Sequence, residues 1–67
     1  MLSARNQFKG TVKSIKLGAV MAEVVITASG LEFVAAITRG SVESLKLKEG
    51  QSATVVIKAT EVLVAND

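Results

Sequence analysis

The chain has 67 residues but neither cysteine nor histidine, and this absence limits how its fold can be stabilised. A domain of this size buries only about 60% of the surface of its unfolded chain, so it usually needs disulfides, a structural metal or self-association. Disulfides and the common zinc sites are excluded here. Because 49% of the residues are nevertheless hydrophobic, one small subunit cannot bury all of them. The composition therefore predicts a homo-oligomer.

The same composition excludes several classes of function. Without Cys or His the chain has no thiol nucleophile and no imidazole base, and its six carboxylates are scattered, so we expect no enzyme. A net charge of +2 and only two aromatic residues argue against a nucleic-acid partner. The longest uncharged stretches have eight residues, and the N-terminus lacks the apolar run of a signal peptide. We therefore expect a cytoplasmic protein with no membrane partner.

The residue pattern favours β-strands throughout the chain. Ten Val, four Ile and five Thr are β-branched, and such residues suit pleated, half-buried strands. The pattern predicts strands at residues 7–17, 22–28, 31–38 and 52–58, and a short fifth strand at 61–65. In the first strand Phe8 and Val12 share one face while Ile15 falls on the other, which predicts a bulge near Lys13 and Ser14.

Turns and one helical segment complete the predicted fold. Ser29-Gly30 is typical of a tight hairpin. Residues 40–45 predict one short helical turn, with Ser41 as its N-cap and Glu43 in its first turn. Five short strands with a helical turn between the third and the fourth describe an all-β, OB-like five-stranded β-barrel that fills a single domain over residues 1–67. An SH3-like barrel is the alternative architecture.

Three short segments combine hydroxyl groups with positive charge and contain no carboxylate. They are Ser3–Asn6, Thr38–Ser41 and Lys58–Thr60. An ionised tetrahedral oxyanion only accepts hydrogen bonds, so its site needs N–H groups, hydroxyls, and Lys or Arg. Taken singly, each segment also has an ordinary explanation as a chain terminus, a helix cap or a strand end. Together they make the chain a candidate to bind a small anion.

The order and the amino-acid sequences of these segments resemble those of the molbindins, the small molybdenum-pterin-binding proteins whose unit is also called the TOBE domain. The similar stretches are Ser3–Gly10, Gly18–Val24, Ile37–Val42, Leu45–Gly50 and Val56–Val62. They cover nearly the whole chain and follow one another in the order of the family. Because the chain contains no helix-turn-helix and no P-loop, it looks like the free-standing form of this family rather than its regulators or transporter subunits.

The resemblance implies an OB-like barrel that assembles as a homohexamer, a trimer of dimers, and binds molybdate or tungstate at subunit interfaces for storage inside the cell. Carried over residue by residue, the implied site consists of Ser3, Arg5, Ala19, Val20, Thr38, Ser41, Lys58, Ala59 and Thr60. In this site hydroxyls and cations hold the oxyanion and the amides of Ala19 and Val20 face it. Two departures are visible, since Met21 stands where the family commonly has Asn, and Arg39-Gly40 replaces a more typical polar pair.

Two other functions stay open from the residues alone. A small β-barrel that serves as a protein-interaction module, without a small-molecule ligand, would also explain the high hydrophobic content. An OB barrel could instead bind single-stranded nucleic acid, but the absence of Tyr and Trp removes the usual stacking platforms.

Overall fold

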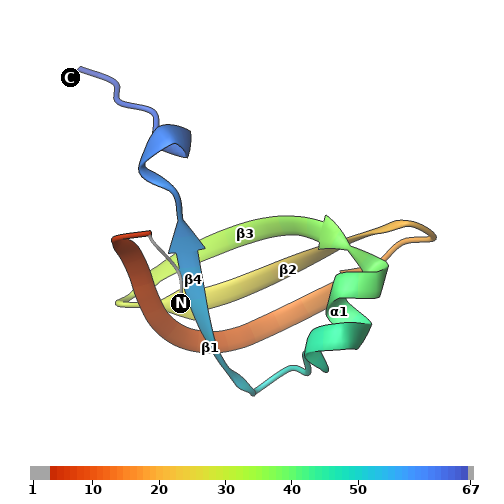
Figure 1. The fold of residues 1–67 in the computed structure, drawn as a ribbon. Helices are drawn as coiled ribbons and strands as arrows, with labels where there is room; N and C mark the ends of the chain where they lie inside the picture. The colour runs from red at the N-terminus through yellow and green to blue at the C-terminus, as the bar shows by residue number, and fades with distance from the viewer. Residues whose placement is uncertain (1–3, 67) are drawn as a thin grey trace.

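A single antiparallel sheet dominates the computed structural model, which describes residues 4–66 (Figure 1). Its strands are β1 (Asn6–Leu17), β2 (Met21–Ala28), β3 (Leu31–Thr38) and β4 (Ser52–Ile57). The helix α1 (Arg39–Leu45) joins β3 to β4, and a 3₁₀ turn, η1 (Ala59–Glu61), follows β4. The strand order is β3-β2-β1-β4, so β3 and β4 form the two edges of the sheet. The first four predicted strands and the helical segment are thereby confirmed.

The long strand β1 pairs with two neighbouring strands, and it bends at a bulge near its middle. Its first half pairs with β4 and its second half with β2, and the register with β2 shifts between Val12 and Ser14. The predicted bulge near Lys13 is therefore confirmed. Since one extra residue reverses the alternation of faces, both Val12 and Ile15 reach the core. Figure 1 shows the resulting curvature of β1 under β4.

The backbone amide of Ile15, just past the bulge, lies beyond the β1–β4 ladder and donates to a carboxylate oxygen of Glu49 at 3.3 Å. Glu49→Ala is expected to lower the free energy of unfolding by about 1 kcal/mol, because this amide then loses its acceptor. Glu49→Gln keeps an acceptor oxygen and should lose clearly less. Urea titrations of both variants measure the difference, and equal losses would show that the hydrogen bond contributes nothing.

The strands β1 and β2 approach each other closely at Gly10 of β1. A Cβ placed on Gly10 would lie 2.8 Å from the Cβ of Ala28 and closer still to the carbonyl oxygen of Thr27. No side chain fits between these atoms, so the tight crossing of β1 over the end of β2 requires glycine.

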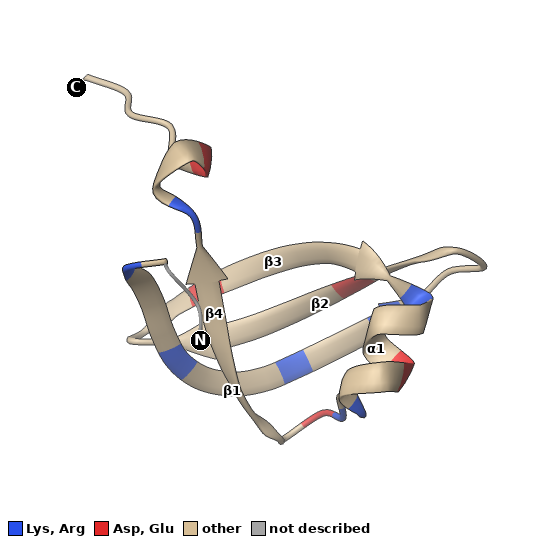
Figure 2. Cartoon of the chain, in the orientation of Figure 1, with Lys and Arg blue, Asp and Glu red and all other residues tan. Residues whose placement is uncertain are grey.

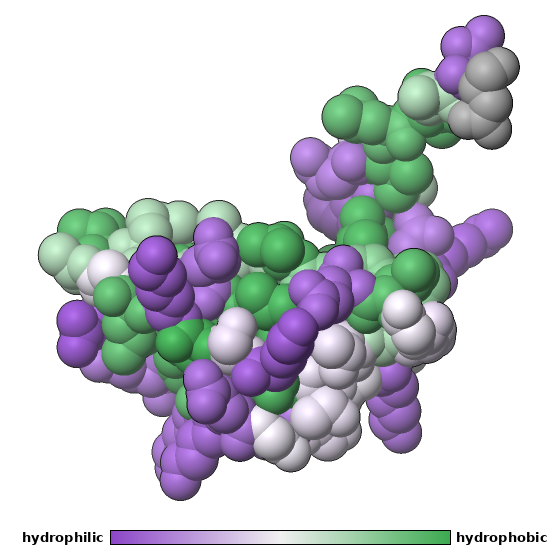
Figure 3. All heavy atoms as spheres, turned by 180° about the vertical axis from the view of Figure 1, so that it is seen from behind, coloured by the Kyte–Doolittle hydropathy of each residue, from purple (hydrophilic) through white to green (hydrophobic). Residues whose placement is uncertain are grey.

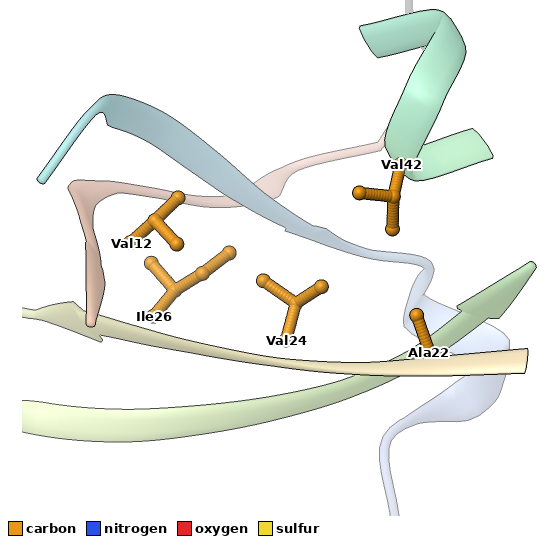
Figure 4. Packing of buried hydrophobic residues seen from close by; sticks show 5 residues of the cluster. All are labelled: Val12, Ala22, Val24, Ile26 and Val42. Atoms are coloured by element: carbon orange, nitrogen blue, oxygen red, sulfur yellow. The ribbon is translucent and has the colours of Figure 1, made fainter. Parts of the chain in front are cut away.

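The core is small and is built from β1, β2 and α1. Its buried members are Val12, Ala22, Val24, Ile26 and Val42, which point toward one another in Figure 4. Val42 extends from the middle of α1 and closes one end of the sheet. Phe8 and Phe33 add a stacked pair with ring centroids 5.1 Å apart. By contrast, Leu63 and Val64 are 94% and 92% exposed, so a large share of the apolar surface is left outside this core.

The start of α1 differs from the prediction. Thr38, the last residue of β3, is the N-cap, and its side-chain oxygen accepts a hydrogen bond from the amide of Ser41 at 3.0 Å. The prediction of Ser41 as N-cap is therefore wrong, and Glu43 lies outside the first turn. The physical reason is that Thr38 still has extended dihedral angles while its hydroxyl reaches the third helical residue. The helix thus begins directly where β3 ends.

The segment after β4 also differs from the prediction. The expected fifth strand at 61–65 is not formed within the described chain, because η1 ends at Glu61 and residues 62–66 lead away from the sheet (Figure 1). A strand needs a neighbouring edge to pair with, and none lies beside this segment. The Ser29-Gly30 hairpin is confirmed, since both residues have positive φ (53° and 75°) as its tight turn requires.

Candidate functional site

Arg5 and Lys58 lie together at one end of the sheet, which we call the cationic end (residues 4–5 and 58–60). The β1–β4 ladder pairs Asn6 with Ile57, and the side-chain amide of Asn6 donates to the carbonyl of Ile57 at 3.1 Å. Arg5 and Lys58 are the next residues on each strand, and both are exposed. Figure 2 shows basic residues where β1 begins and where β4 ends. The antiparallel register therefore brings the two cations to the same end of the sheet.

The cationic end also carries donors that are not charged. The turn η1 begins directly after Lys58, and the amide of Glu61 donates to the carbonyl of Lys58 at 2.9 Å. This turn presents Ala59 and the hydroxyl of Thr60 on the surface. Ser3, the remaining predicted residue of this group, lies outside the described residues.

The ion pairs found within residues 4–66 use other cations. Lys13 pairs with Glu32, and Arg39 pairs with Glu43. In this part of the chain no carboxylate lies within ion-pair distance of Arg5 or Lys58. Their positive charges are therefore available to an anion from outside.

The other predicted residues gather at the opposite end of β1, which we call the loop end (residues 18–20 and 38–41). The amide of Arg39 donates to the carbonyl of Val20 at 2.8 Å, and its guanidinium Nη1 donates to the carbonyl of Gly18 at 3.4 Å. These bonds join the β1–β2 loop to the start of α1. Within the described chain, the amides of Ala19 and Val20 donate to no backbone or side-chain acceptor. Two adjacent unsatisfied amides are a common way to bind an anion.

Thr38 and Ser41 lie beside this loop, but their polar groups form hydrogen bonds with each other. The Thr38 hydroxyl accepts from the Ser41 amide and donates to the Ser41 hydroxyl at 2.8 Å. Ser41 keeps only the hydrogen of its own hydroxyl as a donor to a ligand. At the loop end the two free amides are therefore the main donors.

The structure does not bring the two ends together within one subunit. They lie at opposite ends of the twelve-residue strand β1 (Figure 1). Such a strand would span about 40 Å if straight, at about 3.3 Å per residue, and the largest extent of the bent chain is 36 Å. A single small anion cannot touch both ends. Each chain thus carries two separate sets of donors.

An apolar groove of about 380 Å³ lies between the two edges of the sheet. Its lining includes Phe33, Ala35 and Ile37 of β3, Val55 and Ile57 of β4, and Leu47. Among the described residues that line the groove, Thr54 alone has a polar side chain. The groove is open because the four-stranded sheet leaves β3 and β4 as separate edges.

The described residues carry little else of chemical interest. Among residues 4–66 no three His, Cys, Asp or Glu side chains come close enough together to hold a metal ion. No helix in the same range is long and apolar enough to cross a membrane. The sequence analysis included Arg39 in the Thr38–Ser41 segment but did not predict its contacts with the 18–20 loop, and it began the helical turn one residue later, at Gly40.

Known proteins match the chain over most of its length. The TOBE domain family profile matches residues 2–64. Molybdenum-pterin-binding protein 1 of Clostridium pasteurianum is 47% identical over 64 residues, which are 94% of each protein. Molybdenum transport protein ModE of Herbaspirillum seropedicae is 48% identical over 65 residues, 96% of this chain but 24% of ModE. The chain thus spans nearly all of one relative and about a quarter of the other.

Two solved structures have the same fold. A molybdate-binding protein from Sporomusa ovata superposes with a TM-score of 0.93 at 45% identity and covers 98% of both chains. The cytoplasmic molybdate-binding protein ModG, solved with molybdate bound, has a TM-score of 0.83 at 50% identity, over 88% of this chain and 43% of ModG. The resemblance to molbindins inferred from the sequence is confirmed by these matches. The chain belongs to the TOBE domain family.

Proposed function

We propose that this protein binds molybdate, and tungstate as its close analogue, between the subunits of a homo-oligomer, as a cytoplasmic store without enzymatic activity. One observation carries the proposal: the cationic end offers Arg5 and Lys58 with no carboxylate of the described chain within ion-pair distance, and the loop end offers the two unbonded amides of Ala19 and Val20. A dianion that leaves water needs such a set of donors. The molybdate-binding relatives support the choice of anion.

The separation of the two ends supports a site between subunits. If the cationic end of one subunit met the loop end of another, a single anion would gain Arg5, Lys58 and Thr60 from one chain and the amides of Ala19 and Val20 from its neighbour. Ser3 would add a hydroxyl to the first set. A closed ring of such contacts requires a symmetric assembly, and we propose the hexamer, a trimer of dimers, that the family resemblance implies.

The open groove and the C-terminal segment support the same assembly. Residues 62–66 expose Val62, Leu63 and Val64 on a segment that projects from the body and is largely hydrophobic in Figure 3. Both edges of a partner's groove, β3 and β4, lack a neighbour on the groove side. We propose that this segment of one subunit enters the groove of a second copy and completes its five-stranded OB-like barrel.

Calorimetric titration of the purified protein with sodium molybdate tests the function. Binding is expected, and molybdate at 100 times its Kd should stabilise the folded protein by about 2.7 kcal/mol, which a rise in melting temperature reports. Sodium chloride at equal ionic strength is the control for a salt effect. A chain that neither binds molybdate nor melts at a higher temperature in its presence would disprove the proposal.

Arg5→Ala and Lys58→Ala are each expected to raise the Kd for molybdate by roughly 10- to 100-fold, since a hydrogen bond to a charged group contributes about 1.5–3 kcal/mol. Lys48→Ala is the matched control, because it removes an equal charge from the exposed turn before β4 and should change the Kd less than twofold. Titration calorimetry on folded, correctly assembled variants measures all three. Wild-type affinity in both Arg5→Ala and Lys58→Ala would place the site elsewhere.

A protein-interaction module is the second candidate, favoured by the exposed apolar side chains of Leu63 and Val64. The first candidate function requires a homo-oligomer, whereas an interaction module can be a monomer. A monomer in light scattering, together with no molybdate uptake, would support it.

A further inference from the structure

We infer that Arg39 is a positioning residue, which sets the orientation of the free Ala19 amide at the loop end. The inference rests on the proposed function, because it concerns donors of the same anion site. Arg39 is the only residue of the described chain that bonds the 18–20 loop through both its backbone and its side chain. Its guanidinium is itself held by Glu43, with 3.6 Å between Nε and the carboxylate.

The loop needs such support because its turn lacks one of the two backbone hydrogen bonds that usually close a tight hairpin. Gly18 donates its amide to the carbonyl of Met21 at 2.8 Å, but within residues 4–66 the return bond from the Met21 amide to the Gly18 carbonyl is absent. The Gly18 carbonyl accepts from the Arg39 guanidinium instead. Ala19 and Val20 also lack the positive φ that closes the Ser29-Gly30 hairpin. The guanidinium thus takes the place of a turn hydrogen bond.

Peptide geometry links this contact to the direction of the amides. In a trans peptide the C=O and the following N–H point in opposite directions, and the chain has no cis peptide among the described residues. Since the Gly18 carbonyl points toward Arg39, the Ala19 amide points away from it. The bond from the Arg39 amide to the Val20 carbonyl anchors the other end of the loop, although the amide of that peptide belongs to Met21. Arg39 thereby aims the Ala19 amide outward, toward an incoming anion.

Arg39→Met tests the inference, because methionine keeps the length and helix propensity of the side chain but removes its donors. We expect the Kd for molybdate to rise about 3- to 10-fold, and Arg39→Lys to restore part of the affinity. Lys48→Met is the matched control for the lost charge and should change the Kd less than twofold. Wild-type affinity in Arg39→Met, or an equal loss in Lys48→Met, would overturn the inference.

Amide NMR of the ligand-free protein supplies a second readout that does not depend on binding. Arg39→Met should shift the amide resonances of Ala19 and Val20 and leave those of Ser29 and Gly30 in place. Unchanged resonances at Ala19 and Val20 would overturn the inference even if binding were weakened. If the wild-type protein takes up no molybdate, the proposed function fails, while the NMR comparison still decides whether Arg39 orients the loop.

Discussion

Replacing Gly10 by alanine is expected to destabilise the fold by about 3 kcal/mol, the upper part of the usual range for an overpacked site. The added Cβ would overlap the backbone of Thr27 and the side chain of Ala28, and a strand backbone cannot move aside without breaking its ladder. For a domain of this size the loss corresponds to a melting temperature lower by roughly 12–24 °C. Circular dichroism during heating measures it.

Gly40→Ala is the matched control for Gly10→Ala. The nearest atom to a Cβ on Gly40 is the hydroxyl oxygen of Thr38 at 4.0 Å, so the methyl group has room. Because Gly40 lies inside α1, alanine there should stabilise the protein by about 0.5–1 kcal/mol. Gly10→Ala melting within a few degrees of the wild type would mean that β1 and β2 are not held as closely as described.

Ending the chain after Glu61 is expected to abolish both the oligomer and molybdate binding. The truncation removes the exposed apolar segment proposed to fill the groove of a second copy, and with it the contact that brings the two ends of β1 together between subunits. Light scattering coupled to size exclusion measures the mass, and titration calorimetry measures the binding. A truncated chain with the mass and affinity of the full chain would refute the proposed role of the segment.

A point variant in the same segment separates this effect from a general loss of folding. Leu63→Asp leaves the described sheet and core untouched, since Leu63 is almost fully exposed, but would bury a charge in the partner's groove. It should shift the protein toward monomers that retain a strand-rich circular dichroism spectrum. Asn66→Asp, which adds the same charge beyond the apolar residues, should leave the mass unchanged.

The strands could be predicted from the sequence because their patterns are local. Apolar, β-branched patterns and the Ser29-Gly30 dipeptide were enough to predict β2, β3 and the hairpin between them. The bulge in β1 was visible as a change of phase between Val12 and Ile15. The fifth strand could not be assigned to a partner, because pairing depends on an edge that the chain's own sheet does not place beside residues 62–66. Local pattern gives propensity, whereas pairing is decided by the tertiary arrangement.

The candidate site could be predicted only as a set of residues. Hydroxyls and cations without neighbouring carboxylates marked the segments around Arg5 and Lys58, and the structure places both at the same end of the sheet. The capping role of Thr38 was missed because Thr and Ser are both good caps, and only the end of β3 decides between them. The contacts of Arg39 were missed because they depend on a loop nineteen or more residues earlier in the chain, a distance over which sequence periodicity carries no information.

The length of β1 has a consequence for how such a protein would respond to its own abundance. If one anion is bound jointly by the cationic end of one chain and the loop end of another, ligand binding and subunit association become parts of the same equilibrium. Dilution would release the anion as it separates the chains, and anion scarcity would loosen the chains in turn. Such a store would release its anion when the concentration of either the anion or the protein falls.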